Sequence, residues 1–221
     1  MHAGRRDFLE TLAMGAAGAA MLTAASATEA AAQGQAAGWD LSWVKRLTGR
    51  YRAVFDVLAI EDGYGVWRAA IWRRQYSTIF NVPERNLATV VNIRHDAIAL
   101  AMNQTFWDRY GIAKKWDVRD PATRQPTLRN PVAARTGAHA LPSEYAGFTL
   151  ENLLAGGATV LACALALRDC ASLVSTTDRV DMAVAEKQVR DMLVPGVILQ
   201  PSGVFSAVLA QDNGCRYVRA S

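Results

Sequence analysis

Apolar and polar positions follow two alternating patterns over residues 50–221. Short, almost wholly apolar runs such as 87–93 are typical of parallel strands that are buried on both faces of a sheet. Longer stretches with apolar residues three or four positions apart, such as 63–81, are typical of amphipathic helices. The two patterns predict strands at 50–60, 87–93, 159–162, 197–199 and 215–218, and helices at 63–81, 96–110, 148–154, 164–174, 180–193 and 203–212.

This alternation of strands and helices predicts an α/β fold. Because right-handed crossovers join successive parallel strands, helices come to cover both faces of the sheet. We therefore expect a three-layer α/β/α sandwich with a mostly parallel five-stranded sheet in flavodoxin-like order. In the order 2-1-3-4-5 the second strand lies beside the first, at one edge of the sheet. Residues 50–221 are expected to form this domain, preceded by a spacer and N-terminal segment at 33–49.

The first 32 residues do not follow these patterns. Arg5 and Arg6 precede an apolar stretch rich in Ala and Gly, and small-x-small motifs then end at Ala27 and at Ala32. Paired arginines, a short apolar stretch and a small-residue cleavage site are the parts of a twin-arginine (Tat) signal peptide. We therefore expect export by the Tat translocase to a bacterial periplasm, with cleavage after Ala32 favoured over Ala27. The alternative is a buried Ala-rich helix that begins with two arginines.

No stable membrane anchor is expected, because no segment approaches about 20 strongly apolar residues. The net charge is modest: 24 Lys and Arg stand against 20 Asp and Glu, and 22 against 17 remain without residues 1–32. A nucleic-acid-binding domain would need a dense basic face, which this scattered charge does not predict. Nucleic acid is therefore not an expected partner.

Residues 111–142 interrupt the regular pattern. Prolines break the segment and basic residues are frequent in it: Pro121, Pro126, Pro131, Pro142, Lys114, Lys115, Arg119, Arg124, Arg129 and Arg135. A long segment without a periodic apolar pattern inside a compact domain is typical of a functional lid, an interface arm or a disordered insert. We leave these three interpretations open.

Cys163 is the principal candidate for chemistry. It follows the predicted third strand, and ligands of parallel α/β sheets bind at the carboxyl ends of the strands. There its thiol would face the free N–H groups of the following helix, which favour the reactive thiolate. Ser202 and Gly203 follow the fourth strand and would bring a second helix N-terminus to the same edge, forming an anion-binding site. The alternative is that Cys163 is a buried residue that only packs.

His95 follows the second strand and is a candidate acid–base group or anion ligand. In the order 2-1-3-4-5 it would lie two strands from Cys163, about 10 Å away and too far for a direct hydrogen bond. Its alternative role is that of a histidine at a helix start, held by Asp96 or the backbone.

The two other cysteines are weaker candidates. Cys170 lies two helical turns beyond Cys163, roughly 10 Å away, and Cys215 begins the last strand at the opposite end of the sheet. We therefore expect no intramolecular disulfide. No CxxC or histidine cluster predicts a metal site, and no GxGxxG motif predicts a nicotinamide or flavin cofactor.

Several stretches resemble the DsrE/DsrF-like family, which has the YchN-like fold. They are GATVLACA at 157–164, LVPGV at 193–197 leading into PSGV at 201–204, AQDNGCRYV at 210–218, and VVNIRH at 90–95. The resemblance implies a three-layer α/β/α domain that often forms homo- or hetero-oligomers. In several relatives a cysteine after the third strand carries sulfur as a persulfide, and Cys163 occupies that position. Those sulfur-relay relatives work in the reducing cytoplasm, whereas this chain is expected to be exported.

Two functional hypotheses follow. In the first, the protein is a periplasmic sulfur carrier, or at most a sulfurtransferase-like enzyme, with Cys163 as acceptor and His95 as assistant. Its partners would be a sulfur donor or acceptor protein and further copies of the same chain. In the second, it is a non-catalytic ligand-binding or oligomeric assembly protein in which residues 111–142 grip an acidic ligand or another subunit.

Overall fold

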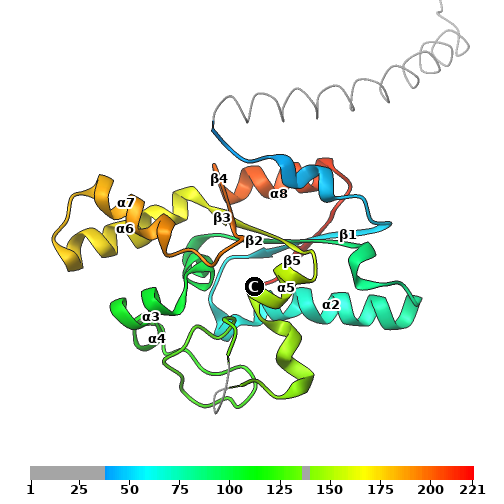
Figure 1. Ribbon diagram of the computed structural model, residues 1–221, viewed down its shortest axis with the longest axis horizontal. Coiled ribbons are helices and arrows are strands. Elements are labelled where there is room, and N and C mark those ends of the chain that lie inside the picture. Colours follow the sequence, from blue (N-terminus) through cyan, green and yellow to red (C-terminus); the bar gives the residue numbers. More distant parts are fainter. Residues whose placement is uncertain (1–37, 136–139) are drawn as a thin grey trace, which may run out of the picture. The chain divides into compact units, whose positions relative to one another are not determined.

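The computed structural model describes residues 38–135 and 140–221 (Figure 1). The predicted Tat signal peptide, with both cleavage sites, lies outside the described residues, as does most of the spacer. The chain divides into two units, Met1–Ser42 and Trp43–Ser221. In the described part of the first unit, the Ser42 amide donates a hydrogen bond to the Asp40 carboxylate over 2.8 Å.

The described part of the second unit contains a parallel sheet of five strands. They are β1 (Tyr51–Val57), β2 (Leu87–Ile93), β3 (Thr159–Cys163), β4 (Ile198–Gln200) and β5 (Arg216–Arg219), in the order β4-β3-β2-β1-β5. Every neighbouring pair is parallel. The predicted three-layer α/β/α sandwich is confirmed, and the sheet is consistent with a flavodoxin-like fold.

The neighbours of β2 differ from the order 2-1-3-4-5. β2 lies between β1 and β3 instead of at an edge. The connections from β1 to β4 all step in one direction across the sheet, and the chain then returns over the other face to place β5 beside β1. Residues that follow β2 and β3 are therefore brought together at one edge of the sheet.

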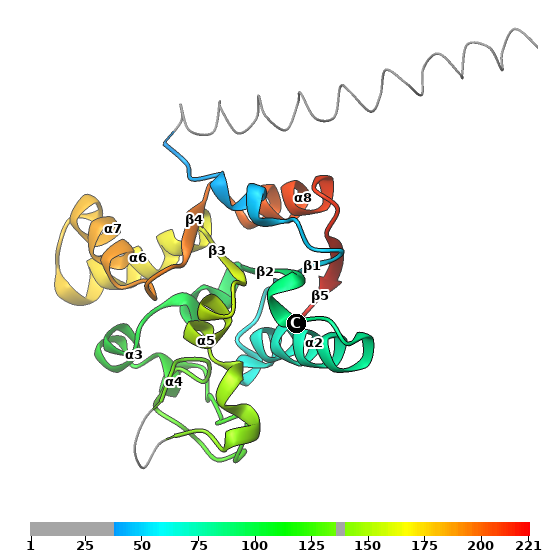
Figure 2. The same cartoon turned by 45° about the vertical axis from the view of Figure 1, so that its right-hand side comes forward.

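Helices cover both faces of the sheet (Figures 1 and 2). One face carries α2 (Tyr64–Phe80), α3 (Gln104–Tyr110), α5 (Leu150–Ala155), α6 (Ala164–Asp178) and α7 (Met182–Asp191). The other carries α8 (Gly203–Asp212) and the 3-10 helix η1 (Ser42–Arg46). Among the described residues, no helix has both the length and the apolar character needed to cross a membrane.

Two cores lie on opposite faces of the sheet, as strand alternation requires. Phe55, Val91 and Val160 belong to the larger core, whereas Val54 and Val90 belong to the smaller one. The central strands β2 and β3 contribute apolar side chains to both cores. They are therefore buried along their whole length.

The single helix predicted at 96–110 is wrong. The structure has a 3-10 helix, η4 (His95–Ala101), followed by α3. Met102 between them is extended and forms a bridge with Leu193, and the Asn103 side chain accepts a hydrogen bond from the Phe106 amide over 3.0 Å. An N-cap at Asn103 starts a new helix, which is why the apolar pattern alone did not separate the two.

The described part of segment 111–142 is folded, with short regular elements. It contains α4 (Ile112–Lys115) and a bridge between Arg119 and Pro126, and η6 (Ser143–Phe148) follows it. Short 3-10 turns η2 (Glu61–Gly63) and η3 (Glu84–Asn86) complete the described elements. The interpretation as a disordered insert is therefore wrong for residues 111–135, which pack through buried residues such as Val118, Asn130 and Val132.

Candidate functional site at the carboxyl edge of the sheet

A cavity of about 220 Å³ lies beyond the carboxyl ends of β2, β3 and β4. It is lined by Arg94, His95, Cys163, Leu165, Ala166, Asp169, Ser202, Gly203 and Val204. The four site residues predicted from the sequence, Cys163, His95, Ser202 and Gly203, all line this cavity. We call this cavity the Cys163 pocket.

Cys163 stands at the junction between β3 and α6. It is the last residue of the strand and the N-cap of the helix, and its Sγ accepts a hydrogen bond from the Ala166 amide over 3.4 Å. The residue is 6 % exposed, so it is both a core residue and part of the pocket wall. A thiolate at this position is stabilised by the helix N-terminus and by the amide hydrogen bond.

His95 lies nearer to Cys163 than the order 2-1-3-4-5 predicts. Because β2 pairs directly with β3, the two residues follow neighbouring strands and line the same pocket. His95 begins η4 with a left-handed backbone, φ 51°, and its side chain is exposed. The separation of two strands expected from the sequence was wrong.

A hydrogen bond defines the tautomer of His95. Nη1 of Arg94 lies 2.7 Å from Nε2 of His95. A guanidinium group can only donate, so Nε2 accepts and the proton of the neutral ring is on Nδ1. The ring partner of His95 is therefore Arg94 and not Asp96, the partner considered from the sequence.

Ser202 and Gly203 form the start of α8. Ser202 is the N-cap, and its Oγ accepts a hydrogen bond from the Phe205 amide over 3.1 Å. Gly203 lies directly against the side chain of Arg94. Both residues thus line the pocket, although the Ser202 hydroxyl is already engaged by its own helix.

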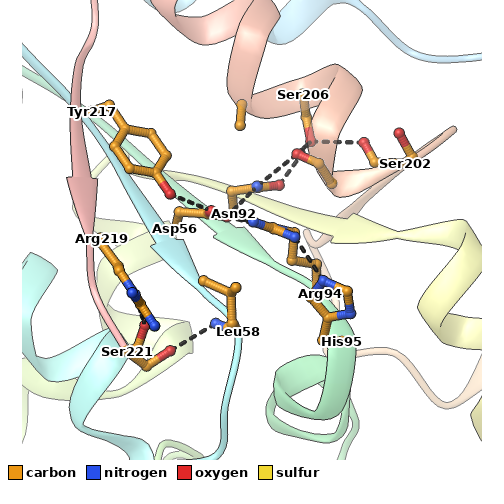
Figure 3. Close-up of polar contacts among 12 residues, drawn as sticks. Asp56, Leu58, Asn92, Arg94, His95, Ser202, Ser206, Tyr217, Arg219 and Ser221 are labelled. Atoms are coloured by element: carbon orange, nitrogen blue, oxygen red, sulfur yellow. Dashed lines mark hydrogen bonds and ion pairs between the residues drawn. The ribbon is translucent and has the colours of Figure 1, made fainter.

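Arg94 also lines the pocket, although no role was predicted for it from the sequence, and it forms a polar network with Asp56 (Figure 3). Its Nε and Nη2 donate to the two carboxylate oxygens of Asp56, over 2.9 and 2.8 Å. Asp56 is fully buried and also accepts hydrogen bonds from Tyr217 Oη, over 2.7 Å, and Asn92 Nδ2, over 2.8 Å. β1, β2 and β5 are thereby tied together at their carboxyl ends.

These contacts shift the pKa values of the network. Burial alone would raise the pKa of Asp56, but the hydrogen bonds from Arg94, Tyr217 and Asn92 and the charge of Arg94 lower it overall. The hydrogen bond to Asp56 raises the pKa of Arg94 and of Tyr217. The carboxylate and the guanidinium are therefore both charged at neutral pH.

Asn92 connects the same network to α8. Its Nδ2 also donates to the carbonyl of Gly203, over 2.8 Å, and its Oδ1 accepts from Ser206 Oγ, over 2.7 Å. The start of α8 is thus held against β2 by buried hydrogen bonds. A polar residue in an apolar strand run needs such partners, so Asp56 and Asn92 were the sequence signals for this network.

The two other cysteines lie away from the pocket lining. Cys163, Cys170 and Cys215 are all free thiols. Burial, followed by the charge of Asp169, raises the pKa of Cys170 to about 12, and burial raises that of Cys215 to about 11. Both are therefore protonated at neutral pH. Within the described ranges, no group of three or more His, Cys, Asp or Glu residues is placed to hold a metal ion.

A larger cavity, of about 600 Å³, borders α3 and segment 111–142. Among the described residues, its lining includes Asp120 and Arg135, which pair with each other, and Arg129, but no cysteine or histidine. Arg124 of the same segment pairs with Asp62 over 3.4 Å. We regard the smaller cavity as the candidate site because it contains the nucleophile.

The fold and the site define an α/β/α protein with a cysteine and a histidine in a small pocket at the carboxyl edge of the sheet. No protein-family model, curated protein or solved structure matches the chain. The resemblance to DsrE/DsrF-like proteins therefore enters only as a proposal.

Proposed function

We propose that the protein is a DsrE/DsrF-like sulfur carrier, at most sulfurtransferase-like in activity, that holds sulfur as a persulfide on Cys163. The supporting observation is that the Cys163 thiol at a helix N-terminus shares one small pocket with His95. Cysteines in such surroundings are more reactive than buried cysteines that only pack. The raised pKa values of Cys170 and Cys215 leave Cys163 as the candidate thiol.

The proposed step conserves atoms and electrons. The Cys163 thiolate attacks the outer sulfur of a hydropersulfide donor, R–S–SH. The bond between the two donor sulfurs breaks and a new S–S bond forms on Cys163. The inner sulfur leaves as R–S⁻ and takes up the proton that Cys163 released. Transfer to an acceptor thiol is the reverse reaction with a different thiol.

The pocket residues support this step in different ways. The Ala166 amide stabilises the thiolate through its hydrogen bond to Sγ. His95 keeps its proton on Nδ1, because Nε2 is engaged by Arg94, and this N–H can donate a hydrogen bond to a leaving thiolate. Ser202 takes no part in this step; its Oγ caps α8 by accepting the Phe205 amide.

The proposal includes export through the Tat translocase and assembly with further copies of the chain. In an oxidising compartment a persulfide would need a dedicated donor protein and protection from oxidation. Substituting Arg5 and Arg6 by Lys is expected to stop export. Mass spectrometry of the periplasmic protein would give the mature N-terminus, expected at residue 33.

Intact mass spectrometry tests the carrier role. The folded protein is incubated with a hydropersulfide donor in parallel with Cys163→Ser and with a Cys170→Ser/Cys215→Ser double variant. We expect the wild type and the double variant to gain one sulfur atom, reversibly with reductant, and Cys163→Ser to gain none. Absence of any gain, with a thiol that reacts only after unfolding, would contradict the proposal.

A second candidate function is non-catalytic binding of an acidic ligand by segment 111–142. The supporting observation is the cavity of about 600 Å³ with Arg129 in its wall. Native mass spectrometry with small dicarboxylates tests it. Binding that is lost in Arg129→Ala, with no change in Cys163 reactivity, would favour this candidate.

A further inference from the structure

We propose that the Cys163 pocket selects uncharged sulfur donors over anionic ones, and that Asp169 is the residue that excludes anions. This inference rests on the proposed carrier function and adds to it the charge class of the donor. It also replaces the anion-binding role expected for Ser202 and Gly203 with the opposite preference.

The cation in the pocket wall is already neutralised. Arg94 carries the positive charge, and its Nε and Nη2 are bound to the carboxylate of Asp56, which is fully buried. The third nitrogen, Nη1, donates to His95. An incoming anion therefore meets an arginine whose charge is cancelled by a carboxylate and whose three nitrogens are all engaged.

Asp169 has no such partner. It belongs to α6, six residues beyond Cys163, and lines the same pocket. Within residues 38–135 and 140–221, the ion pairs of the structure do not include Asp169. Its charge is therefore not cancelled by a neighbouring cation, and it repels negative groups that approach the sulfur.

The two helix N-termini, of α6 and α8, do not make the pocket favourable to anions. Each offers about half a positive charge. One amide at each start is already bound, that of Ala166 to Cys163 Sγ and that of Phe205 to Ser202 Oγ. In the reactive state the thiolate itself is the anion that α6 stabilises. An anionic donor would bring a further negative charge into the pocket that this thiolate and Asp169 both line.

The remaining wall is apolar and the pocket is small. Leu165 and Val204, each 62 % exposed, line the pocket together with Ala166. A volume of about 220 Å³ is below the roughly 300–1,000 Å³ typical of sites for larger ligands. The apolar wall and the small volume suit the protonated, neutral end of a hydropersulfide with an uncharged carbon chain next to the sulfur. They disfavour sulfur oxyanions.

Alkylation by two probes of similar size tests the inference. Iodoacetamide is neutral and iodoacetate is anionic. Their rates with Cys163 are measured in the folded Cys170→Ser/Cys215→Ser protein, and the ratio is compared with that for the same protein in denaturant. We expect the folded state to raise the preference for iodoacetamide about twofold, which is the effect in water of one like charge roughly 9 Å away, the helical rise from Cys163 to Asp169.

Variants assign the effect to Asp169. Asp169→Asn should lose most of the preference, and Asp169→Glu should keep it. Asp117→Asn, at a carboxylate that is 84 % exposed and outside the pocket lining, should leave it unchanged. Equal or faster reaction with iodoacetate would overturn the inference and leave the carrier function standing. If neither probe reacts with the folded protein, the carrier function fails and the inference fails with it.

Discussion

Gly203 approaches Arg94 so closely that a Cβ atom on the glycine would lie 2.4 Å from Cδ of the arginine. Any larger residue would displace the guanidinium that holds His95, or move the start of α8 away from β2. We expect Gly203→Ala to lower the free energy of unfolding by about 1–3 kcal/mol, the usual effect of overpacking. Urea denaturation would measure this loss.

Gly147→Ala is the matched control. A Cβ on Gly147 would have no heavy atom within 4 Å. The control should change stability by less than about 0.5 kcal/mol, as a surface substitution does. Equal losses in the two variants would contradict the packing argument for Gly203.

Asp56→Asn should destabilise the protein in a pH-dependent way. Removing one partner of a buried ion pair commonly costs about 3 kcal/mol or more. The pKa of Asp56 is lowered below its ordinary value of 3.8, so its contribution is present above that value and is lost as the pH falls through the lower folded value. The difference in unfolding free energy between wild type and variant should therefore be larger at pH 7 than near pH 3.

Urea titrations of both proteins across this range provide the measurement. Asp117→Asn is the control, because the carboxylate of Asp117 is 84 % exposed and its pair with Arg119 is long, at 4.0 Å. A difference between wild type and Asp56→Asn that stays constant from pH 7 to pH 3 would show that the carboxylate charge of Asp56 does not stabilise the fold.

The strands were predictable because burial controls their composition. β2 and β3 are apolar runs that the structure buries on both faces. Edge strands expose residues, so the same burial pattern indicates an inner position for β2. β5, with Tyr217 and Arg219 exposed, is such an edge. The order 2-1-3-4-5 would place the fully buried β2 at an edge, whereas the structure places it between β1 and β3.

The site was only partly predictable. The rule that ligands bind at strand carboxyl ends selected Cys163 and His95, because it needs only the strand boundaries. The ion pair between Asp56 and Arg94 joins residues 38 positions apart, and no local pattern specifies such a contact. A charged residue within the apolar first strand indicated only that Asp56 would need a partner.

Arg73→Met should destabilise the fold strongly. Arg73 is 2 % exposed, and it donates to Thr89 Oγ1 over 2.9 Å and to the carbonyl of Gly156 over 2.6 Å. Methionine can fill the space but leaves these acceptors without a donor. We expect a loss of about 3 kcal/mol in the free energy of unfolding, measured by urea denaturation.

Arg74→Met is the control for this substitution. The side chain of Arg74 is exposed and donates to the carbonyl of Glu144 over 2.8 Å. A loss below about 1 kcal/mol is expected, as for other exposed interactions. A comparable effect at the two neighbouring arginines would mean that the buried bonds of Arg73 contribute little.

The three thiols should differ in reactivity. Because burial raises the pKa of Cys170 to about 12 and that of Cys215 to about 11, both remain protonated at pH 8 in the folded protein. Brief treatment with iodoacetamide at pH 8 should therefore modify Cys163 alone, and all three cysteines should react in urea. Peptide mass spectrometry identifies the modified residues. Early modification of Cys170 or Cys215 would show that their burial is incomplete in solution.

Asn130 should control the order of segment 111–135. Its Nδ2 donates to the carbonyls of Leu100, over 2.9 Å, and Met102, over 2.8 Å, and its Oδ1 accepts from the Val132 amide. Asn130→Leu leaves these buried groups unsatisfied, at about 1–3 kcal/mol for each. We expect faster trypsin cleavage within the segment and little change in its rate with Gln125→Ala, whose side chain is exposed. An unchanged cleavage pattern in Asn130→Leu would show that the other buried residues of the segment hold it in place without this contact.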